Sequence, residues 1–288
     1  MAWEDFCTNI SISASKRSSI SSKYGMITSR LNRDFWGYDS KTNHSLQVGS
    51  YGRGTATDKI SDVDMLFILP YEVYRQYNQH LYNGQSALLQ AVKNSIQDTY
   101  FNSDIGADGQ VVQINFSDFK FEVLPVFELE SGGFRHPNSN DGGKWEDTHP
   151  RSEINAINTL NSICNGNVKR LGKMARAWTS NVNLNMGGML IDTLVHNFLN
   201  YYKYADKNYV YYDWISRDFF LYLKEQKKDQ SYWLAPGSNK YIWKRDPFQY
   251  KATQAYNTSL EAIDAESNGY SYTSKKKWRE IYGYGFPN

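Results

Sequence analysis

The chain has 288 residues, of which 40% are hydrophobic and 22% are charged, so it is long enough for two lobes and apolar enough to bury a core. A formal net charge of +2 excludes the strongly basic balance of a dedicated duplex-binding protein, so charge alone predicts no nucleic-acid polymer as partner. The two cysteines are too few for a disulfide framework or a zinc site built from cysteine alone. No segment approaches the roughly 20 apolar residues that span a bilayer, and the N-terminus lacks the apolar region of a secretory signal. We therefore expect a soluble, cytoplasmic protein that does not bind membranes.

The first half of the chain reads as helix and sheet. Apolar residues at helical spacing predict one long helix over residues 5–35. A strand, a glycine-rich turn and a second strand ending at Pro70 follow over residues 45–70, and a helix is expected from Glu72 to Tyr100. Two runs rich in valine, isoleucine and phenylalanine, 109–118 and 119–128, predict a hairpin, and the Gly, Asn and Asp density of residues 131–150 predicts a long loop.

The second half of the chain reads as helical. Apolar residues recur at spacings of three and four in five stretches: 151–166, 167–181, 187–202, 211–226 and 246–266. The sequence thus predicts an α+β fold of two domains. Residues 1–150 form a lobe with a small mixed sheet and a long N-terminal helix, and residues 151–288 form a helical lobe.

The second strand contains two aspartates, Asp62 and Asp64, within the apolar run "DVDMLFIL". Residues two apart in a strand point to the same face and lie about 7 Å apart along the backbone. Two carboxylates held in this way repel each other unless cations lie between them. Mg²⁺ prefers such hard oxygen ligands, and two ions about 4 Å apart can clamp the attacking and leaving oxygens of a phosphoryl transfer. Glu122, which interrupts the apolar run "FKFEVLPVF", is the natural third ligand.

The turn before these aspartates is rich in glycine. Gly49 and Ser50 lie where the first strand ends, and Gly52, Gly54 and Thr55 follow. Glycines let backbone N–H groups approach a phosphate closely, which favours a cradle for a nucleoside triphosphate beside the metals. Taken alone, the turn is weak evidence, because any tight turn needs glycine for positive φ.

Together these motifs resemble a known superfamily. Gly49-Ser50, Gly54-Thr55 and Ser61-Asp62-Val63-Asp64 look like the signature of the DNA polymerase β-like nucleotidyltransferases. More narrowly, "GSYGRGTATDKISDVDM", "FEVLPVF", "GGKWEDTHP" and "KMARAW" followed by "GGMLIDTL" resemble the bacterial CD-NTases. These are relatives of cyclic GMP-AMP synthase and oligoadenylate synthetase that make cyclic oligonucleotide signals in CBASS antiphage defence. The resemblance spans residues 48–194, about half of the chain.

The resemblance implies a nucleotidyltransferase lobe and a helical lobe with the active site in the cleft between them. It implies attack of a nucleotide hydroxyl on the α-phosphate of ATP, GTP or a pyrimidine triphosphate, with two Mg²⁺ ions, or Mn²⁺ as a substitute, and with pyrophosphate leaving. The products would be cyclic di- or trinucleotides. Asp62, Asp64 and Glu122 would be the catalytic metal ligands, although many relatives have aspartate at the third position.

The nucleotide-binding residues that the resemblance implies are Gly49, Ser50, Thr55, Lys173 and Arg176. The family's lysine facing the donor triphosphate appears here as Arg176, with Lys173 one turn earlier. An ancillary CBASS protein is a candidate partner. Activation by duplex DNA is not implied, because the chain has no Cys and His cluster like the zinc-binding insertion of the DNA-sensing animal relatives.

Two other functions remain open. One is a linear nucleotidyltransferase that acts on RNA or protein, against which the near-neutral charge and the chain length argue. The other is a catalytically silent nucleotide-binding module, against which the three acidic side chains argue. The five histidines show no metal-ligand spacing, and the aromatic segment 201–214 reads as packing residues more readily than as a surface for stacking bases.

Overall fold

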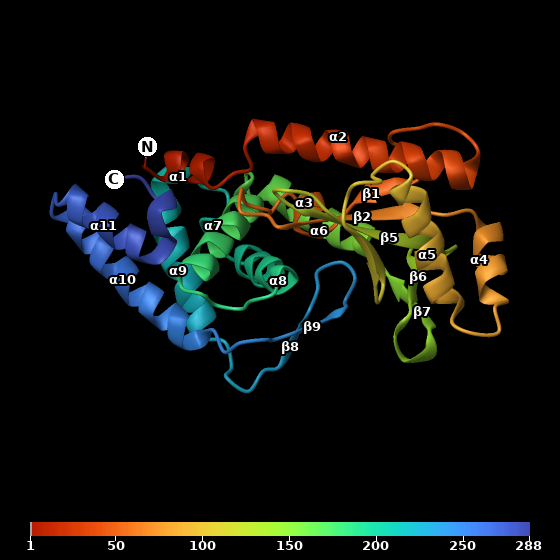
Figure 1. The fold of residues 1–288 in the computed structure, drawn as a ribbon. Helices are drawn as coiled ribbons and strands as arrows, with labels where there is room; N and C mark the ends of the chain where they lie inside the picture. Colours follow the sequence, from red (N-terminus) through yellow and green to blue (C-terminus); the bar gives the residue numbers. More distant parts are fainter. Residues whose placement is uncertain (1) are drawn as a thin grey trace. The chain divides into compact units, whose positions relative to one another are not determined.

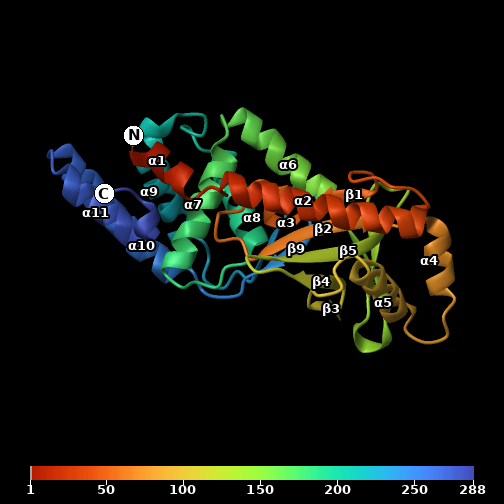
Figure 2. The same cartoon turned by 45° about the horizontal axis from the view of Figure 1, so that its top comes forward.

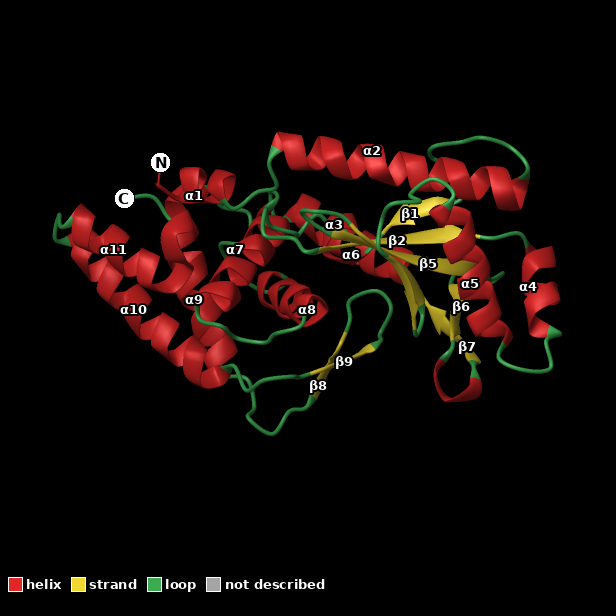
Figure 3. Cartoon of the chain, in the orientation of Figure 1, coloured by secondary structure: helices red, strands yellow, loops and turns green. Residues whose placement is uncertain are grey.

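The computed structural model of the chain describes residues 2–288 and groups them into two units. The sheet unit comprises Ser13–Gly52 and Ile60–Arg151, and the helical unit comprises Met1–Ile12, Arg53–Lys59 and Ser152–Asn288. Figure 3 shows the strands of both units in yellow and the helices of both units in red. The expected lobes, 1–150 and 151–288, differ from these units in two segments. Residues up to Ile12 and the segment Arg53–Lys59 pack with the helices instead of with the sheet.

The sheet unit contains one mixed sheet in the order β1-β2-β5-β4-β3, with β6 pairing with β5 and with β7. Strands β2 and β5 are parallel and the other pairs are antiparallel. The antiparallel pairing of β4 with β5 confirms the predicted hairpin. The strands are β1 Ser45–Gln47, β2 Asp62–Ile68, β3 Ile105–Asp108, β4 Val111–Asn115, β5 Lys120–Glu128, β6 Phe134–Asn138 and β7 Lys144–Thr148.

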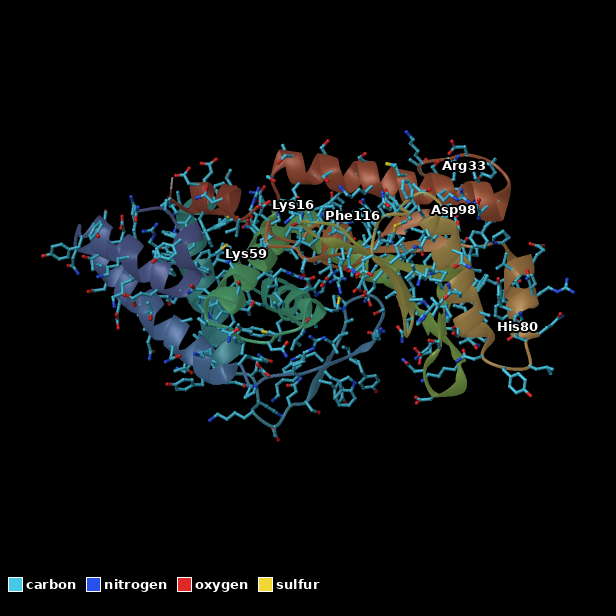
Figure 4. All side chains as sticks on the ribbon, viewed as in Figure 1. Lys16, Arg33, Lys59, His80, Asp98 and Phe116 are labelled. Carbon is cyan, nitrogen blue, oxygen red and sulfur yellow. The ribbon has the colours of Figure 1, made fainter. Side chains whose placement is uncertain are left out.

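Helices α2 and α5 pack on this sheet and on each other (Figures 1 and 2). The helices of the unit are α2 Ala14–Leu31, the single turn α3 Gly49–Gly52, α4 Tyr71–Asn78 and α5 Gly84–Gln97, and a π-helical turn, Asn32–Trp36, continues α2. Alternate side chains of β2 and β5, among them Val63 and Phe121, are fully buried. Asp98, labelled in Figure 4, accepts a hydrogen bond of 2.9 Å from Arg30 and so joins the C-terminal ends of α5 and α2. Helices α2 and α5 thus cover one face of the sheet.

The expected helix over residues 5–35 is wrong in one respect, because it is two helices. Helix α1, Ala2–Asn9, ends before α2 begins at Ala14. The Ser13 side chain caps α2 by accepting a hydrogen bond from the Lys16 N–H at 3.3 Å. A serine can satisfy these first N–H groups of a helix better than an apolar residue can, so this serine-rich stretch starts a new helix there. The break separates α1, which packs in the helical unit, from α2.

Two further expectations are corrected. The helix expected over residues 72–100 is divided into α4 and α5. The chain turns at Asn83, whose φ is +27° and whose side chain caps α5, and a Cβ at Gly84 would lie 1.9 Å from the Tyr77 carbonyl oxygen of α4. The long loop expected over residues 131–150 is the β6–β7 hairpin. Its Gly, Asn and Asp residues serve the turn, where Asp141, Gly142 and Gly143 all have positive φ.

The helical unit confirms the five predicted helical stretches and adds α11 and a small hairpin, and α1 from the N-terminal segment also packs in it. Its elements are α1, α6 Pro150–Ile163, α7 Asn167–Asn181, α8 Gly188–Leu199, α9 Tyr212–Lys224, α10 Gln249–Ser267 and α11 Ser271–Tyr282, with β8 Tyr232–Leu234 paired to β9 Tyr241–Trp243. Phe6 of α1 is fully buried in the same hydrophobic cluster as Trp178 and Phe220. In the aromatic segment 201–214, the Tyr204 ring contacts the rings of Tyr211 and Trp214, as expected of packing residues. None of the helices within residues 2–288 combines the length and apolar character needed to cross a membrane.

Candidate active site

The predicted acidic residues lie on two neighbouring strands of the sheet unit. Parallel pairing of β2 with β5 places Asp64 directly beside Glu122, and Asp62 directly beside Lys120. Paired residues of parallel strands point to the same side of a sheet, so all four side chains share one face. The intervening Val63 and Phe121 are fully buried on the opposite face. The structure therefore sets Asp62, Asp64 and Glu122 on one face of the sheet, in adjacent register positions.

Lys120 is the residue of this face that the sequence reasoning missed. Its ammonium lies 2.8 Å from Glu122 Oε1 and 3.3 Å from Asp62 Oδ1. The hydrogen bond to Glu122, together with both negative charges, raises the pKa of Lys120 above its ordinary value. The signal was available, because Lys120 precedes Glu122 by two residues, the same spacing that relates Asp62 to Asp64.

The donor set of this face fits a divalent cation, because three carboxylates supply the hard oxygen ligands that Mg²⁺ prefers. Two of the three, Asp62 and Glu122, contact the Lys120 ammonium instead. Glu122 Oε1 is held by Lys120 and also accepts a hydrogen bond of 3.3 Å from Gln113. Over residues 2–288, no group of three or more Asp, Glu, His or Cys side chains is gathered closely enough to ligate one ion.

Gly49 lies directly against the Asp64 side chain at the acidic face. It follows β1, its φ is +61°, and a Cβ built on it would lie 1.7 Å from Asp64 Oδ2. The Val48 N–H donates to the Asp64 carbonyl oxygen at 3.0 Å, which fixes this approach. Ser50 is the next residue, in the single turn α3. The glycine of the glycine–serine pair is thus required both by its backbone conformation and by the Asp64 carboxylate against it.

The other predicted nucleotide ligands, Thr55, Lys173 and Arg176, belong to the helical unit. Two of them converge on Asp192 of α8, whose side chain is completely buried. Arg176 donates to both Asp192 carboxylate oxygens at 2.6 and 2.9 Å, and the Thr55 hydroxyl donates to it at 3.0 Å. Arg53 Nε adds a fourth hydrogen bond at 2.8 Å. Arg176 and Thr55 therefore have an internal partner.

The Asp192 cluster is balanced in charge. Two arginines face Asp192 and Glu153, whose carboxylate lies 4.0 Å from the Arg53 guanidinium. Burial by itself would raise the pKa of Asp192, but Arg176 and Arg53 outweigh it and hold the pKa below its ordinary value. Sequence reasoning missed Asp192 and Arg53. The signal for Asp192 was a single carboxylate in the otherwise apolar helix "GGMLIDTLVHNFL".

Lys173 and Arg176 are one turn apart on α7 but line different hollows. Lys173 donates to the Ser11 hydroxyl at 3.2 Å and, with Arg170 and Tyr209, lines a hollow of about 230 Å³. Arg176 lines a second hollow, of about 320 Å³, between segment 57–59 and segment 282–285. The two cations therefore do not act on one ligand position within the helical unit.

Known proteins resemble this chain in sequence and in fold. The profile of the Second Messenger Oligonucleotide or Dinucleotide Synthetase domain matches residues 1–161. A Bacillus cereus (strain VD146) protein described as a probable cyclic nucleotide synthase is 22% identical over 288 residues, covering 83% of this chain and 81% of its own.

Solved structures of CD-NTases share the fold. CdnC of E. coli MS115-1, solved in complex with HORMA-deltaN, aligns with a TM-score of 0.68 at 13% identity over 100% of this chain and 98% of its own. CdnG of Bradyrhizobium diazoefficiens, in complex with GTP, gives 0.68 at 8% identity, over 98% and 94% of the two chains. Vibrio cholerae DncV, in complex with a linear intermediate, gives 0.66 at 12% identity, over 85% and 69%. These matches confirm the predicted α+β nucleotidyltransferase fold. Because the family profile covers more than half of the chain, the chain belongs to the Second Messenger Oligonucleotide or Dinucleotide Synthetase family and is a CD-NTase, a nucleotidyltransferase enzyme.

Proposed function

We propose that the protein joins nucleoside triphosphates and cyclises the product into a cyclic di- or trinucleotide, releasing pyrophosphate. The observation that carries this proposal is the register of β2 and β5, which sets Asp62, Asp64 and Glu122 on one face of the sheet beside the Gly49 turn. The relatives support the same chemistry. The Bacillus protein is described as a probable cyclic nucleotide synthase, and DncV was solved with a linear 5′ pppA(3′,5′)pG intermediate.

We further propose that Asp62, Asp64 and Glu122 hold two Mg²⁺ ions, which Mn²⁺ can replace. Bound there, the ions would supply Lewis-acid stabilisation of the phosphate oxygens and would lower the pKa of the attacking hydroxyl. The chain contributes three anionic oxygen donors on rigid strands. Gly49 leaves the space beside Asp64 Oδ2 that any other residue would fill. The substrates would be ATP, GTP or a pyrimidine triphosphate, in line with the structures of CdnC with ATP and of CdnG with GTP.

For the triphosphate we propose contacts from the backbone at Gly49 and from the Ser50 hydroxyl, with Lys173 as the cation on α7. Arg176 and Thr55 are proposed to act mainly through Asp192, because that carboxylate already accepts hydrogen bonds from both. In this role they hold the segment Arg53–Lys59, which joins the glycine–serine turn to β2, on the helical unit. Ser50→Ala is expected to weaken triphosphate binding by one neutral hydrogen bond, and Lys173→Ala by more, since a charge-assisted contact is stronger.

The biological role proposed is second-messenger synthesis in cytoplasmic antiphage defence of the CBASS type. CdnC was solved in complex with HORMA-deltaN, which supports an ancillary protein as partner of this chain. We propose no duplex DNA activator.

The proposed reaction is tested by incubating the protein with labelled triphosphates and Mg²⁺ or Mn²⁺, and then with phosphatase. With the label on the α-phosphate, a cyclic product has no terminal phosphate, so phosphatase leaves its chromatographic mobility unchanged. A product that loses terminal phosphates and changes mobility would instead establish a linear transferase, and the absence of any product under every metal would favour a nucleotide-binding module. The Asp62→Asn, Asp64→Asn double variant should make no product. Asp98→Asn, which removes a carboxylate that pairs with Arg30 at the end of α5 and not with the acidic residues, should match the unchanged protein.

A further inference from the structure

We propose that Lys120 is a built-in counter-cation of the acidic face, and that it sets how tightly the metal-free enzyme binds a divalent cation. This inference rests on the proposed metal-binding role of Asp62, Asp64 and Glu122. The observation behind it, the position of the Lys120 ammonium, is separate from the one behind the proposed function. Lys120 is neither one of the proposed metal ligands nor part of the sequence motifs.

The geometry places the ammonium where a cation would be held. Lys120 lies beside Asp62 across the β2–β5 pair and two residues before Glu122 on its own strand. Its ammonium bridges the two carboxylates, at 3.3 Å from Asp62 and 2.8 Å from Glu122. The lysine side chain is 32% exposed and the Glu122 side chain 23%, so this contact is partly shielded from water. One carboxylate from each strand thus already shares a single cation that the chain itself supplies.

Charge balance determines how an arriving metal competes with this ammonium. Three carboxylates and one ammonium leave the face with a net charge of −2, so it still attracts a divalent cation. The cation must take Glu122 and Asp62 from the ammonium, which has to turn away on its flexible stem. Repulsion between the two cations opposes binding unless that movement is completed. Lys120 therefore competes with the metal for the same oxygen atoms.

The ammonium also holds the metal-free face together. Without a cation, three carboxylates on adjacent strand positions repel one another, which would splay the face. Lys120 keeps Asp62 and Glu122 close together until metal replaces it. The cost is a weaker metal affinity in the absence of nucleotide, so that a metal arriving with its triphosphate is favoured over a metal arriving alone.

The experiment compares Lys120→Met with the unchanged chain. Mn²⁺ is titrated into nucleotide-free protein, and the free ion is followed by its electron paramagnetic resonance signal. We expect Lys120→Met to bind Mn²⁺ about tenfold more tightly. Without metal, the same variant should melt at a lower temperature, and added Mn²⁺ should raise its melting temperature by more than it raises that of the unchanged protein.

The helical unit offers a matched control. Lys277 of α11 also bridges two carboxylates, Glu261 at 2.7 Å and Glu280 at 3.5 Å, and its side chain is 29% exposed. Lys277→Met removes an equivalent bridge from another part of the chain and should leave the Mn²⁺ affinity unchanged. Lys120→Arg keeps the charge and should bind Mn²⁺ as weakly as the unchanged protein. Lys120→Gln is the second neutral variant if Lys120→Met does not fold.

Two results would overturn the inference. The first is an unchanged Mn²⁺ affinity in the neutral Lys120 variants, and the second is an equal gain in Lys277→Met. Failure of the proposed metal site is recognised separately, because the Asp62→Asn, Asp64→Asn double variant would then bind Mn²⁺ as well as the unchanged protein does.

Discussion

Gly49 shows how one missing methyl group shapes the acidic face. Gly49→Ala combines a left-handed backbone position with a Cβ 1.7 Å from Asp64 Oδ2, so the carboxylate or the turn must move. A displacement of about 1 Å at a catalytic group lowers turnover roughly a hundredfold, and we expect at least that loss in a nucleotidyl-transfer assay.

Gly37→Ala separates the two causes. Gly37 also has a positive φ, +78°, but a Cβ there would meet nothing within 4 Å. It should therefore lower the free energy of unfolding by the backbone term alone, about 1–2 kcal/mol, and keep its activity. If Gly49→Ala turned over as fast as Gly37→Ala, the proposed role of Asp64 would be wrong.

Glu122 provides the second prediction at this scale. Asp62 and Asp64 remain in Glu122→Gln, so the variant should bind the donor triphosphate nearly normally while losing most of its turnover. Glu122→Asp should retain part of the activity, and Mn²⁺, with its looser geometric demands, should restore it further than it restores Glu122→Gln. Separate measurements of triphosphate affinity and single-turnover rate check this. Normal turnover in Glu122→Gln would exclude Glu122 as the third ligand.

At the scale of elements, the Asp192 cluster joins α7, α8 and the segment Arg53–Lys59 within the helical unit. Asp192→Asn leaves Arg53 and Arg176 buried without their anion, so we expect the free energy of unfolding to fall by about 3–5 kcal/mol. Hydrogen exchange should rise first in residues 53–59.

Arg135 and Asp147 form a similar two-bond pair in the β6–β7 hairpin, with side chains 36% and 42% exposed. Asp147→Asn should therefore cost under about 1 kcal/mol. If the free energy of unfolding fell by the same amount in both variants, burial would not explain the contribution of the Asp192 ion pairs to stability.

The same cluster predicts a dependence of stability on pH. The pKa of Asp192 is lower in the folded protein than in the unfolded chain, so its contribution is complete above the unfolded pKa and is lost as pH falls through the folded value. Denaturation midpoints measured from neutral pH down to about pH 3 should decline less steeply in Asp192→Asn than in the unchanged protein. A parallel decline would assign the acid sensitivity to other carboxylates.

The elements that were predictable are those whose signal is local. Alternation of apolar and acidic residues identified β2, and the Val and Phe runs identified the β4–β5 hairpin, whose strand β5 carries Glu122. The break before Gly84 was missed although its signal is local, because the turn-forming pair Asn83-Gly84 was read as part of one continuous helix. The β6–β7 hairpin was missed because its strands are rich in charged and polar residues, and pairing outweighs their weak strand propensity. Asp192 and Arg53 are 139 residues apart, and no local pattern relates them.

At the scale of the whole molecule, the chain is shared between two units that are not continuous in sequence. It passes from one to the other after Ile12, Gly52, Lys59 and Arg151. A fragment of residues 152–288 would therefore lack Phe6, which is fully buried in the core of the helical unit, and the Arg53 and Thr55 partners of Asp192.

We expect this fragment to lack a cooperative thermal transition by circular dichroism. Adding residues 1–12 through a flexible linker should increase its helicity by restoring α1. A sharp transition in the fragment alone, at the temperature of the full chain, would show that α1 and the segment Arg53–Lys59 contribute nothing to the fold of this unit.

The packing of α1 against the C-terminal residues suggests a circular permutation of the chain. Helix α1, which begins at Ala2, and the C-terminal residues lie in the helical unit (Figure 1), and Trp3 contacts Phe286 and Trp278 with ring centroids 4.9 and 4.7 Å apart. A short peptide can therefore connect residue 288 to Ala2, and new ends can be opened at His149, between β7 and α6. In this circular permutant α6–α11 and α1 become one uninterrupted stretch, followed by the sheet unit, with only Arg53–Lys59 still supplied from within it.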